Sequence, residues 1–208
     1  MQPYYTEPGI TIYHGDCREI LPTLGKVDLV LTDPPYPLEF IECWSSLSLV
    51  CKSVLPEGGF CLAYSGQTHL PEVLSRMGEH LEYCWQLVLV HAGCNQAIHH
   101  RHVMCGYKPI LVFSNGKPSF PDSGYFKDTL RGSGRSKSSH PWEQSASELH
   151  PIIEHYSSDA GTILDPFMGS GTTLRAAKDL GRKAIGIEIE ERYCEIAVKR
   201  LKQEVLNI

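Results

Sequence analysis

The sequence predicts a mixed α/β protein, with a mostly parallel β-sheet covered by helices on both faces. Short apolar runs of strand length alternate with segments whose apolar residues recur at helical spacing. These runs are apolar on both faces, which is typical of parallel strands buried between two helical layers. Two further runs, at 82–91 and 108–115, follow one another without a helix between them. They predict one antiparallel hairpin at an edge of the sheet.

The first half of the chain is expected to alternate between strands and helices. Short runs rich in apolar and β-branched residues predict strands at 9–16, 27–33 and 58–65. Apolar residues at three- and four-residue spacing predict helices at 17–24, 40–55 and 70–81. A Pro-Glu-Gly-Gly turn ends the second of these helices, and Pro71 is well placed to begin the third.

The second half predicts a helix, a strand, a glycine-containing turn and a further helix–strand–helix unit. The same patterns place helices at 145–157, 172–181 and 190–206. They place strands at 161–167 and 183–189. The segment 116–139 is rich in serine and glycine and has no clear element. A loop of that length inside a compact domain usually has a function.

Composition limits the class of protein. The 208 residues are 42% hydrophobic and 21% charged, which predicts one globular domain over residues 1–208. No apolar run is long enough to span a bilayer, and the first residues lack a secretory pattern, so we expect a cytoplasmic protein without a membrane partner. The eight cysteines form no CxxC pair, and the histidines and cysteines of 91–105 fit no common zinc spacing. We therefore expect no metal site.

Four acidic residues stand where predicted strands end. They are Asp16, Asp33, Asp165 and Glu188. In an open parallel sheet, ligands bind beyond the carboxyl ends of the strands, so four acids in these positions would surround one crevice. A single acid at such a place is often only a helix cap. Four together favour a binding site.

The sequence DPFMGSGTT joins a strand end, a turn and a helix start. Gly169 and Gly171 let the backbone approach a ligand, and Thr172 or Thr173 can cap the helix. Glu188, at the end of the next strand, can accept hydrogen bonds from a ribose. The turn lacks the third glycine of GxGxxG and the GK[ST] of a P-loop. A ligand with a ribose and a small carboxylate, such as S-adenosylmethionine, fits better, although a tight strand–helix turn remains an alternative.

Together, DPPY at 33–36 and DPFMGSGTT at 165–173 resemble the amino-group DNA methyltransferases, which modify adenine N6 or cytosine N4. The catalytic motif precedes the cofactor loop, which is the motif order of the β group. The segment HGDCREIL at 14–21 resembles the short acidic motif of this family. The segment that begins with His-Pro at 140 resembles the one before the cofactor strand, but Gln144 and Ser145 replace part of its Lys-Pro feature.

The resemblance covers about residues 12–201 and implies a Rossmann-like sheet of seven strands, six parallel and one antiparallel. It implies S-adenosylmethionine as cofactor, with Asp16 contacting the adenine and Cys17 beside it. The residues implied to bind the cofactor are Asp16, Cys17, Asp165, Pro166, Phe167, Gly169, Ser170, Gly171, Thr172, Thr173 and Glu188.

The resemblance also assigns the catalytic residues, which are Asp33, Pro34, Pro35 and Tyr36. The Asp33 carboxylate and the Pro34 carbonyl would each accept a hydrogen bond from the amino group, which frees its nitrogen lone pair. Proline fixes the direction of that carbonyl. Tyr36 would stack on the base, an interaction worth ~1–3 kcal/mol. The methyl group would then move in line to a base that has been flipped out of the duplex.

The DNA contacts are expected on a locally basic loop. The net charge is −5, but 115–140 holds five cations and two acids, so the rest of the chain carries −8. Cations of this kind neutralise phosphates, although a solvated surface loop is an equal alternative. The candidate contacts are Arg101, Lys117, Lys127, Arg131, Arg135 and Lys137.

The base and the target sequence are the least determined features. Asp33 favours adenine N6, because N4-cytosine members more often have serine before PPY. An N4-cytosine or RNA methyltransferase and a non-catalytic S-adenosylmethionine-binding regulator are the alternatives, and the intact DPPY argues against the regulator. About two dozen loop residues are available for recognition. We therefore expect modest sequence specificity, or help from a homodimer or a partner, in a DNA-associated enzyme of the restriction–modification type.

Overall fold

A twisted nine-stranded sheet organises the molecule. The structure, a computed structural model, describes residues 2–91, 96–120, 124–132 and 145–203. The strand order is β1-β2-β11-β10-β3-β4-β8-β5-β9. The bounds are β1 Tyr5–Glu7, β2 Ile10–His14, β3 Leu29–Thr32, β4 Phe60–Tyr64, β5 Glu82–His91, β8 Tyr107–Ser114, β9 Thr129–Gly132, β10 Thr162–Asp165 and β11 Lys183–Glu188.

The centre of this sheet confirms the predicted class. Strands β2, β11, β10, β3 and β4 are parallel neighbours, β8 runs against them, and β5 pairs antiparallel with β8. These are the six parallel strands and one antiparallel strand expected. The count of seven is too low, because β1 adds an antiparallel strand beside β2 and β9 adds a parallel strand beside β5.

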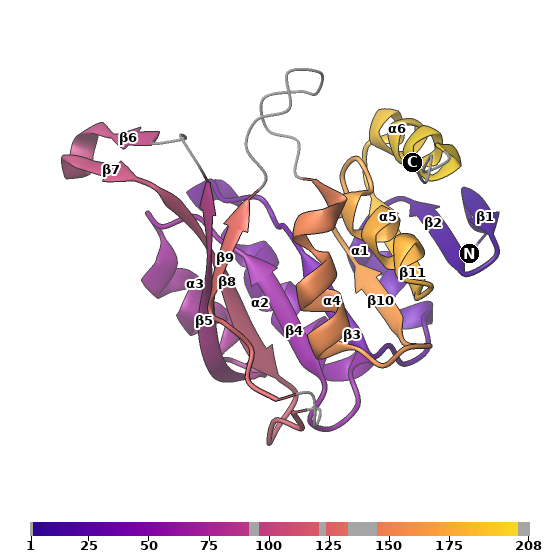
Figure 1. The fold of residues 1–208 in the computed structure, drawn as a ribbon, viewed down its shortest axis with the longest axis horizontal. Coiled ribbons are helices and arrows are strands. Elements are labelled where there is room, and N and C mark those ends of the chain that lie inside the picture. Colours follow the sequence, from indigo (N-terminus) through magenta and orange to yellow (C-terminus); the bar gives the residue numbers. More distant parts are fainter. Residues whose placement is uncertain (1, 92–95, 121–123, 133–144, 204–208) are drawn as a thin grey trace.

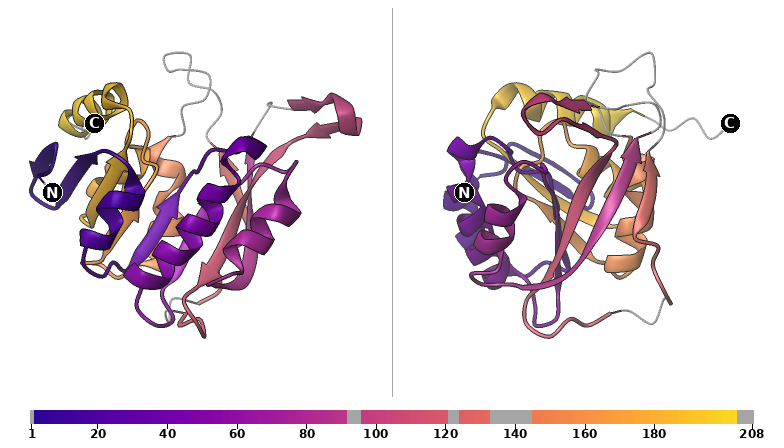
Figure 2. Two further views of the ribbon diagram at one scale, coloured as in Figure 1. Left: turned by 180° about the vertical axis from the view of Figure 1, so that it is seen from behind. Right: turned by 90° about the vertical axis from the view of Figure 1, so that its left-hand side faces the viewer.

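Two helical layers cover the sheet, and each has its own core. Apolar residues of α4, α5 and α6 pack on one face, and those of α1, α2 and α3 pack on the other. Figure 1 shows α4 in front of the sheet with α2 and α3 behind, and the left view of Figure 2 shows the same layers from the back. The bounds are α1 Cys17–Ile20, α2 Glu42–Val54, α3 Leu70–Met77, α4 His150–Tyr156, α5 Thr172–Asp179 and α6 Glu191–Lys202.

A narrow ribbon extends from the sheet between β5 and β8. It consists of β6 (Gln96–Ile98), a 3-10 turn η3 (His99–Arg101) and β7 (Val103–Cys105), with β6 and β7 antiparallel. Both figures show the ribbon reaching past the end of the sheet (Figures 1 and 2). No strand was predicted here from the sequence. His102, with a φ of 53°, makes the left-handed turn that lets the chain reverse.

The segment expected to be one long loop also contains structure. Its strand β9 pairs in parallel with the outer edge of β5, from Val88 opposite Thr129 to His91 opposite Gly132. Before β9, the ring of Phe126 packs against His155 and Tyr156, at centroid distances of 4.8 and 5.7 Å. The segment is therefore attached to α4 and to the sheet edge.

Candidate active site

The four strand-end acids lie on four adjacent strands. Strands β2, β11, β10 and β3 are consecutive in the sheet and parallel, so their carboxyl ends meet at one edge. Asp165 and Glu188 are the last residues of β10 and β11, and Asp33 directly follows β3. Asp16 follows β2 after one glycine. The structure thus brings together the acids that the sequence suggested.

Asp16 is held by its own helix. Its carboxylate caps α1 by accepting a hydrogen bond from the Arg18 amide at 2.9 Å, and the Arg18 guanidinium binds the same carboxylate at 2.5–3.0 Å. These hydrogen bonds from Arg18 keep the pKa of Asp16 below its usual value. Next to it, burial raises the pKa of the Cys17 thiol to about 11. The carboxylate is ionised at neutral pH and the thiol is not.

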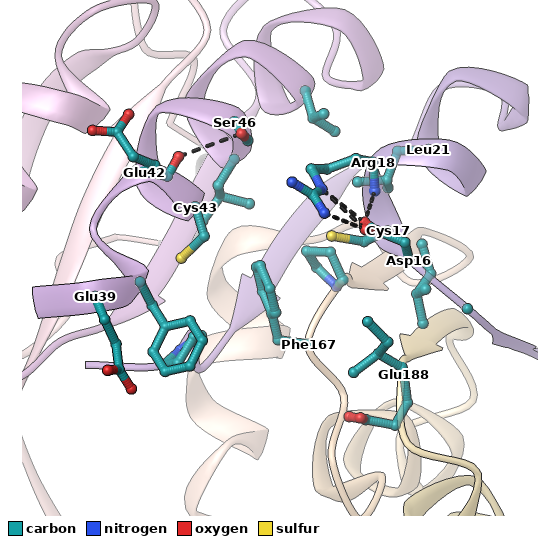
Figure 3. Close-up of a pocket in the computed structure, with 18 residues that line it drawn as sticks. Asp16, Cys17, Arg18, Leu21, Glu39, Glu42, Cys43, Ser46, Phe167 and Glu188 are labelled. Atoms are coloured by element: carbon teal, nitrogen blue, oxygen red, sulfur yellow. Dashed lines mark hydrogen bonds and ion pairs between the residues drawn. The ribbon is translucent and has the colours of Figure 1, made fainter. Parts of the chain in front are cut away.

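A pocket of about 380 Å³ opens beside these acids. Figure 3 shows Asp16, Cys17, Phe167 and Glu188 around it. Its walls come from the turn after β2, from DPPY and α2, from the turn after β10 and from the end of β11. The lining residues are Gly15, Asp16, Cys17, Arg18, Leu21, Pro35, Glu39, Phe40, Glu42, Cys43, Ser46, Leu47, Val50, Pro166, Phe167, Ile187, Glu188 and Ile189.

The wall supplied by α2 was not expected from the sequence. Cys43, Ser46, Leu47 and Val50 line the pocket from one face of this helix. Their spacing of three and four residues was visible, but that pattern also describes a helix face buried in the core. The Cys43 thiol lies toward the same space as Cys17 and Phe167 (Figure 3). Burial raises the pKa of Cys43 to about 12.

The glycine turn holds Glu188 in place. The Gly169 amide donates to Glu188 Oε2 at 3.0 Å, and the Glu190 amide donates to Oε1 at 2.9 Å. A Cβ on Gly169 would meet nothing within 4 Å, so the backbone there borders open space. An oriented carboxylate beside exposed backbone and an apolar wall suits a ligand with ribose hydroxyls and an adenine ring, so these residues fit S-adenosylmethionine.

The two threonines after the turn do not have the predicted capping role. The N-cap of α5 is Gly171, with a φ of 78°, and it makes no side-chain capping hydrogen bond. The Thr172 hydroxyl instead accepts a hydrogen bond from Arg200. Thr173 is buried and its hydroxyl bonds to Asp165. The left-handed glycine places both threonines inside the first helical turn, past the cap position.

Asp165 is buried beneath the turn. Its Oδ1 accepts hydrogen bonds from the Thr32 hydroxyl at 2.7 Å and from the Phe167 amide at 3.1 Å. Burial raises the pKa of Asp165 to about 6, although hydrogen bonds from Thr173 and Thr32 act in the opposite direction. The carboxylate therefore joins β3, β10 and the turn into one unit.

The DPPY segment continues from β3 toward the pocket. Asp33 is 39% exposed, and its Oδ1 accepts a hydrogen bond from the Tyr36 hydroxyl. Pro34 is buried, and Pro35 lines the pocket. Burial, followed by the nearby Asp33 charge, raises the pKa of Tyr36, so the phenol stays protonated and donates. Asp33 thus presents a carboxylate at the surface directly beside the pocket.

Lys108 completes this cluster and was missed from the sequence. Its ammonium lies 2.6 Å from Asp33 Oδ2 and above the rings of Tyr36 and Tyr64, at 5.0 and 4.7 Å from their centroids. Lys108 is the second residue of β8, the strand that runs against its neighbours. The start of an antiparallel strand lies at the carboxyl edge of the parallel ones, which was the signal available in the sequence.

The predicted DNA-contacting cations are dispersed. Arg101 is exposed at the tip of the ribbon, and Arg131, opposite Val90, is exposed near the carboxyl end of β5. Lys117 lies beside Gly58, before the start of β4, and so at the opposite edge of the sheet from Asp33. Lys127 is exposed two residues before β9. Arg135 and Lys137 are outside the described residues.

Two further expectations concern metal and membrane. Among the residues that the structure describes, no three histidine, cysteine or acidic side chains are grouped so that they could hold a metal ion. In the same part of the chain, no helix has the length and apolar character needed to cross a membrane.

Comparison with known proteins identifies the family to which this fold and this pocket belong. The family model described as DNA methylase, of the N6/N4 type, matches residues 72–199, more than half of the chain. The chain therefore belongs to the N6/N4 DNA methylase family and is a DNA methyltransferase. The Escherichia coli (strain K12) protein named "Putative methylase YubD" is 28% identical over 90% of this chain and 88% of its own length.

Other relatives cover most of the chain. The type II methyltransferase M.ScaI of Streptomyces caespitosus is 26% identical over 262 aligned positions, with 100% of this chain and 86% of the relative covered. The crystal structure of the M1.HpyAVI–SAM complex has a TM-score of 0.75 and 28% identity, covering 93% of this chain and 100% of that one. The cytosine-N4-specific PvuII DNA methyltransferase shares the fold, with a TM-score of 0.84, 20% identity, and coverage of 100% and 90%.

Proposed function

We propose that this chain transfers a methyl group from S-adenosylmethionine to the N6 amino group of an adenine in DNA. The observation that carries the proposal is the half-exposed Asp33 of DPPY, held at the carboxyl edge beside the pocket. N4 of cytosine, in DNA or RNA, is the second candidate, because the family contains both chemistries and PvuII is a cytosine enzyme.

Asp33 and Pro34 would act on the amino group. An exocyclic amine is a poor nucleophile because its lone pair is delocalised into the ring. Two acceptors that each take one N–H favour a pyramidal nitrogen with a free lone pair. The Asp33 carboxylate is one acceptor, and the Pro34 carbonyl, fixed by the proline ring, is the other. Pro35 continues the turn, and the Tyr36 hydroxyl bond keeps the Asp33 carboxylate in one orientation.

The cofactor would lie in the pocket between Asp16, Phe167 and Glu188. We assign Glu188 to the ribose hydroxyls and Asp16, with Cys17 beside it, to the adenine. The turn formed by Pro166, Gly169, Ser170 and Gly171 would bring its backbone close to the methionine part, with Asp165, Thr172 and Thr173 supporting it from below. When bound, S-adenosylmethionine supplies a methyl group attached to a positively charged sulfur.

The β6–β7 ribbon and β9 would hold the DNA. Arg101 and Arg131 lie at the same end of the sheet as Asp33, where they can contact phosphates on either side of a flipped base. Lys127, Arg135 and Lys137 extend the same basic segment. Lys117, at the opposite edge, is the weakest of the six candidates.

Few residues of this chain would recognise the DNA target sequence. The alignment with M.ScaI has 262 positions whereas this chain has 208 residues, a difference of 54. The relative therefore carries at least 54 residues without a counterpart here. We infer that residues 1–208 form one domain, in which the segment 115–140 takes part in recognition. The target would be short or degenerate unless a second copy or a partner assists.

The first experiment measures radiolabelled methyl transfer from S-adenosylmethionine into DNA and RNA, followed by nucleoside analysis of the product. Labelled N6-methyladenine in DNA is expected from the native protein. Asp33→Ala should reduce it about 100- to 1000-fold, since one of two acceptors is lost in the transition state. Glu72→Ala, on the exposed face of α3, is the matched control and should be unaffected.

Each other outcome selects an alternative. N4-methylcytosine as product would move the target to cytosine, and label found only in RNA would replace the substrate. If the protein binds the cofactor but labels neither DNA nor RNA, the non-catalytic S-adenosylmethionine-binding regulator is the remaining alternative. Sequencing the methylated DNA then tests the prediction of a short or degenerate target, and a strict motif of five or more bases would contradict it.

A further inference from the structure

A cation lies where the target base is expected. Lys108 Nζ contacts Asp33 Oδ2 at 2.6 Å and lies 5.0 Å from the centroid of the Tyr36 ring, on which the base would stack. It also lies 4.7 Å from the centroid of the Tyr64 ring. Ammonium groups bind the faces of aromatic rings, so both rings stabilise this position. The Lys108 side chain is 22% exposed, so most of it is sheltered within the cluster.

The backbone below this ammonium is fixed. Lys108 pairs with Leu89 of β5, and the carbonyl of Pro109 accepts a hydrogen bond from the Ser65 amide at 3.0 Å. Ser65 directly follows β4, so the start of β8 is tied to the strand next to β3. The Lys108 side chain can change its rotamer, but the Lys108 backbone stays fixed near Asp33. Lys108 is therefore a built-in partner of the catalytic carboxylate.

We propose that Lys108 is a specificity-determining residue that donates a hydrogen bond to the ring nitrogen next to the target amino group. The proposal rests on the methyltransferase function above. Asp33 can only accept while ionised, and Lys108 can only donate, so the two form an acceptor beside a donor. Adenine presents the complementary pair, an N6 donor beside the N1 acceptor, and cytosine presents N4 beside N3.

The same pair is mismatched to the carbonyl edges of the other two bases. Guanine and thymine present a carbonyl acceptor beside a ring N–H donor, which would face Asp33 and Lys108 with like groups. A buried polar group without a partner is costly, so these carbonyl edges bind weakly. When adenine or cytosine enters, its amino N–H replaces the ammonium at Asp33 Oδ2. The ammonium has three hydrogens and turns one of them to the adjacent ring nitrogen.

The test removes the acceptor of the proposed hydrogen bond from the base and the donor from the protein. After the methylated site is identified, an oligonucleotide is made with the target adenine replaced by 1-deazaadenine, or the target cytosine by 3-deazacytosine. kcat/KM is measured for the native protein, for Lys108→Met and for Lys108→Arg on both oligonucleotides. The ratio of natural to deaza substrate cancels the intrinsic reactivity of the analogue when variants are compared.

The native protein should show a ratio 10- to 100-fold greater than Lys108→Met, the expected value of a hydrogen bond from a charged donor. Lys108→Arg keeps a charged donor and should retain part of the discrimination. Cofactor affinity should be unchanged in both variants, because Lys108 does not line the cofactor pocket. An equal ratio in the native protein and Lys108→Met would overturn the proposal.

Two outcomes do not depend on the methionine variant. A native protein that methylates the deaza analogue at least as fast as the natural base would also overturn the proposal, because the ring nitrogen would then contribute nothing. If Lys108→Met does not fold, Lys108→Gln, which keeps an uncharged donor, takes its place. Most of the native preference in kcat/KM for the natural over the deaza substrate should then be lost. Failure of the function itself is separate, since the native protein would then methylate neither oligonucleotide.

Discussion

Two aspartates at neighbouring strand ends have opposite surroundings. Asp33 is 39% exposed and faces an ammonium and a phenol, whereas Asp165 is 3% exposed and accepts hydrogen bonds from neutral donors. Burial raises the pKa of Asp165 to about 6. Both residues precede a proline in the sequence, so their local motifs alone do not separate them.

The buried carboxyl predicts a pH-dependent stability. The pKa of Asp165 in the folded protein is raised from 3.8 to about 6. The protonated carboxyl therefore contributes to folding stability below pH 4, and this contribution is lost as the pH rises through 6. The loss is on the order of 3 kcal/mol. Asp165→Asn keeps the acceptor for Thr32 and Phe167 and should lack this slope. Urea unfolding is measured from pH 4.5 to 7.5. The free energy of unfolding of Asp165→Asn should rise relative to that of the native protein as the pH increases, and the difference should become constant above pH 7.

A constant difference between the two proteins across that range would show that Asp165 titrates normally.

The pocket cysteines should react slowly. The pKa values of Cys17 and Cys43 are raised to about 11 and about 12, so at pH 8 almost none of either residue is thiolate. Alkylation by iodoacetamide should be at least about 100-fold slower than for free cysteine, whose pKa is near 8.5. Peptide mass spectrometry over time gives each rate. Modification of Cys17 at the rate of free cysteine would contradict this pKa.

At the scale of elements, the turn between β10 and α5 combines two different glycine requirements. Gly169 has a φ of 49° and open space around its missing Cβ. Gly171 has a φ of 78°, and its Cβ would lie 2.7 Å from the Cβ of Ala197 in α6. The first glycine serves the local turn. The second also allows α6 to pack against the start of α5.

Alanine substitutions should separate these requirements. Gly169→Ala should cost only the left-handed backbone strain, about 1–2 kcal/mol. Gly171→Ala should cost about 2–5 kcal/mol, because overpacking against α6 adds to that strain. Denaturant unfolding of both variants measures the difference. Equal losses of unfolding free energy in the two variants would mean that α6 can shift away from residue 171 at no energetic cost.

The elements also show where sequence reasoning succeeded. The strands β2, β3, β4, β10 and β11 were predicted because each is an apolar run of strand length. Strand β9 was missed because Thr129–Gly132 is short, partly exposed and polar, and the free edge of β5 determines its pairing. Thr172 was misassigned as a cap because the helix start depends on the φ of Gly171, which the residue type permits but does not specify.

At the scale of the whole molecule, the residues proposed to bind the cofactor and the target base lie at the carboxyl edge of the sheet. The pocket lies beside the carboxyl ends of β2 and β11, Asp33 follows β3, and Lys108 comes from β8. The β6–β7 ribbon extends past the end of the sheet (Figure 1). Its residues Arg101, Val103 and Met104 are exposed. This order predicts that cofactor binding and DNA binding can be separated.

Shortening the ribbon should affect DNA alone. Replacing residues 97–104 by Asn-Gly should lower the affinity for a DNA duplex at least about tenfold, with a reduced salt dependence because Arg101 is lost. Fluorescence anisotropy at several salt concentrations measures this. The cofactor affinity, measured by calorimetry, should stay within about twofold, because the ribbon contributes no residue to the pocket.

Trp85→Ser is the control for that experiment, since Trp85 is 58% exposed on the half of β5 away from the ribbon. It should leave DNA affinity unchanged. A shortened ribbon that binds DNA as tightly as the native protein would remove the ribbon from the DNA interface.

The sequence by itself determined the fold class, the four strand-end acids and their common edge. It could do so because buried parallel strands are apolar runs and their carboxyl ends meet on one side. Only the tertiary structure decided that α2 walls the pocket, that Asp165 is buried and that Lys108 contacts Asp33, 75 residues away in the chain. Such contacts depend on strand order and direction, which local residue patterns do not encode.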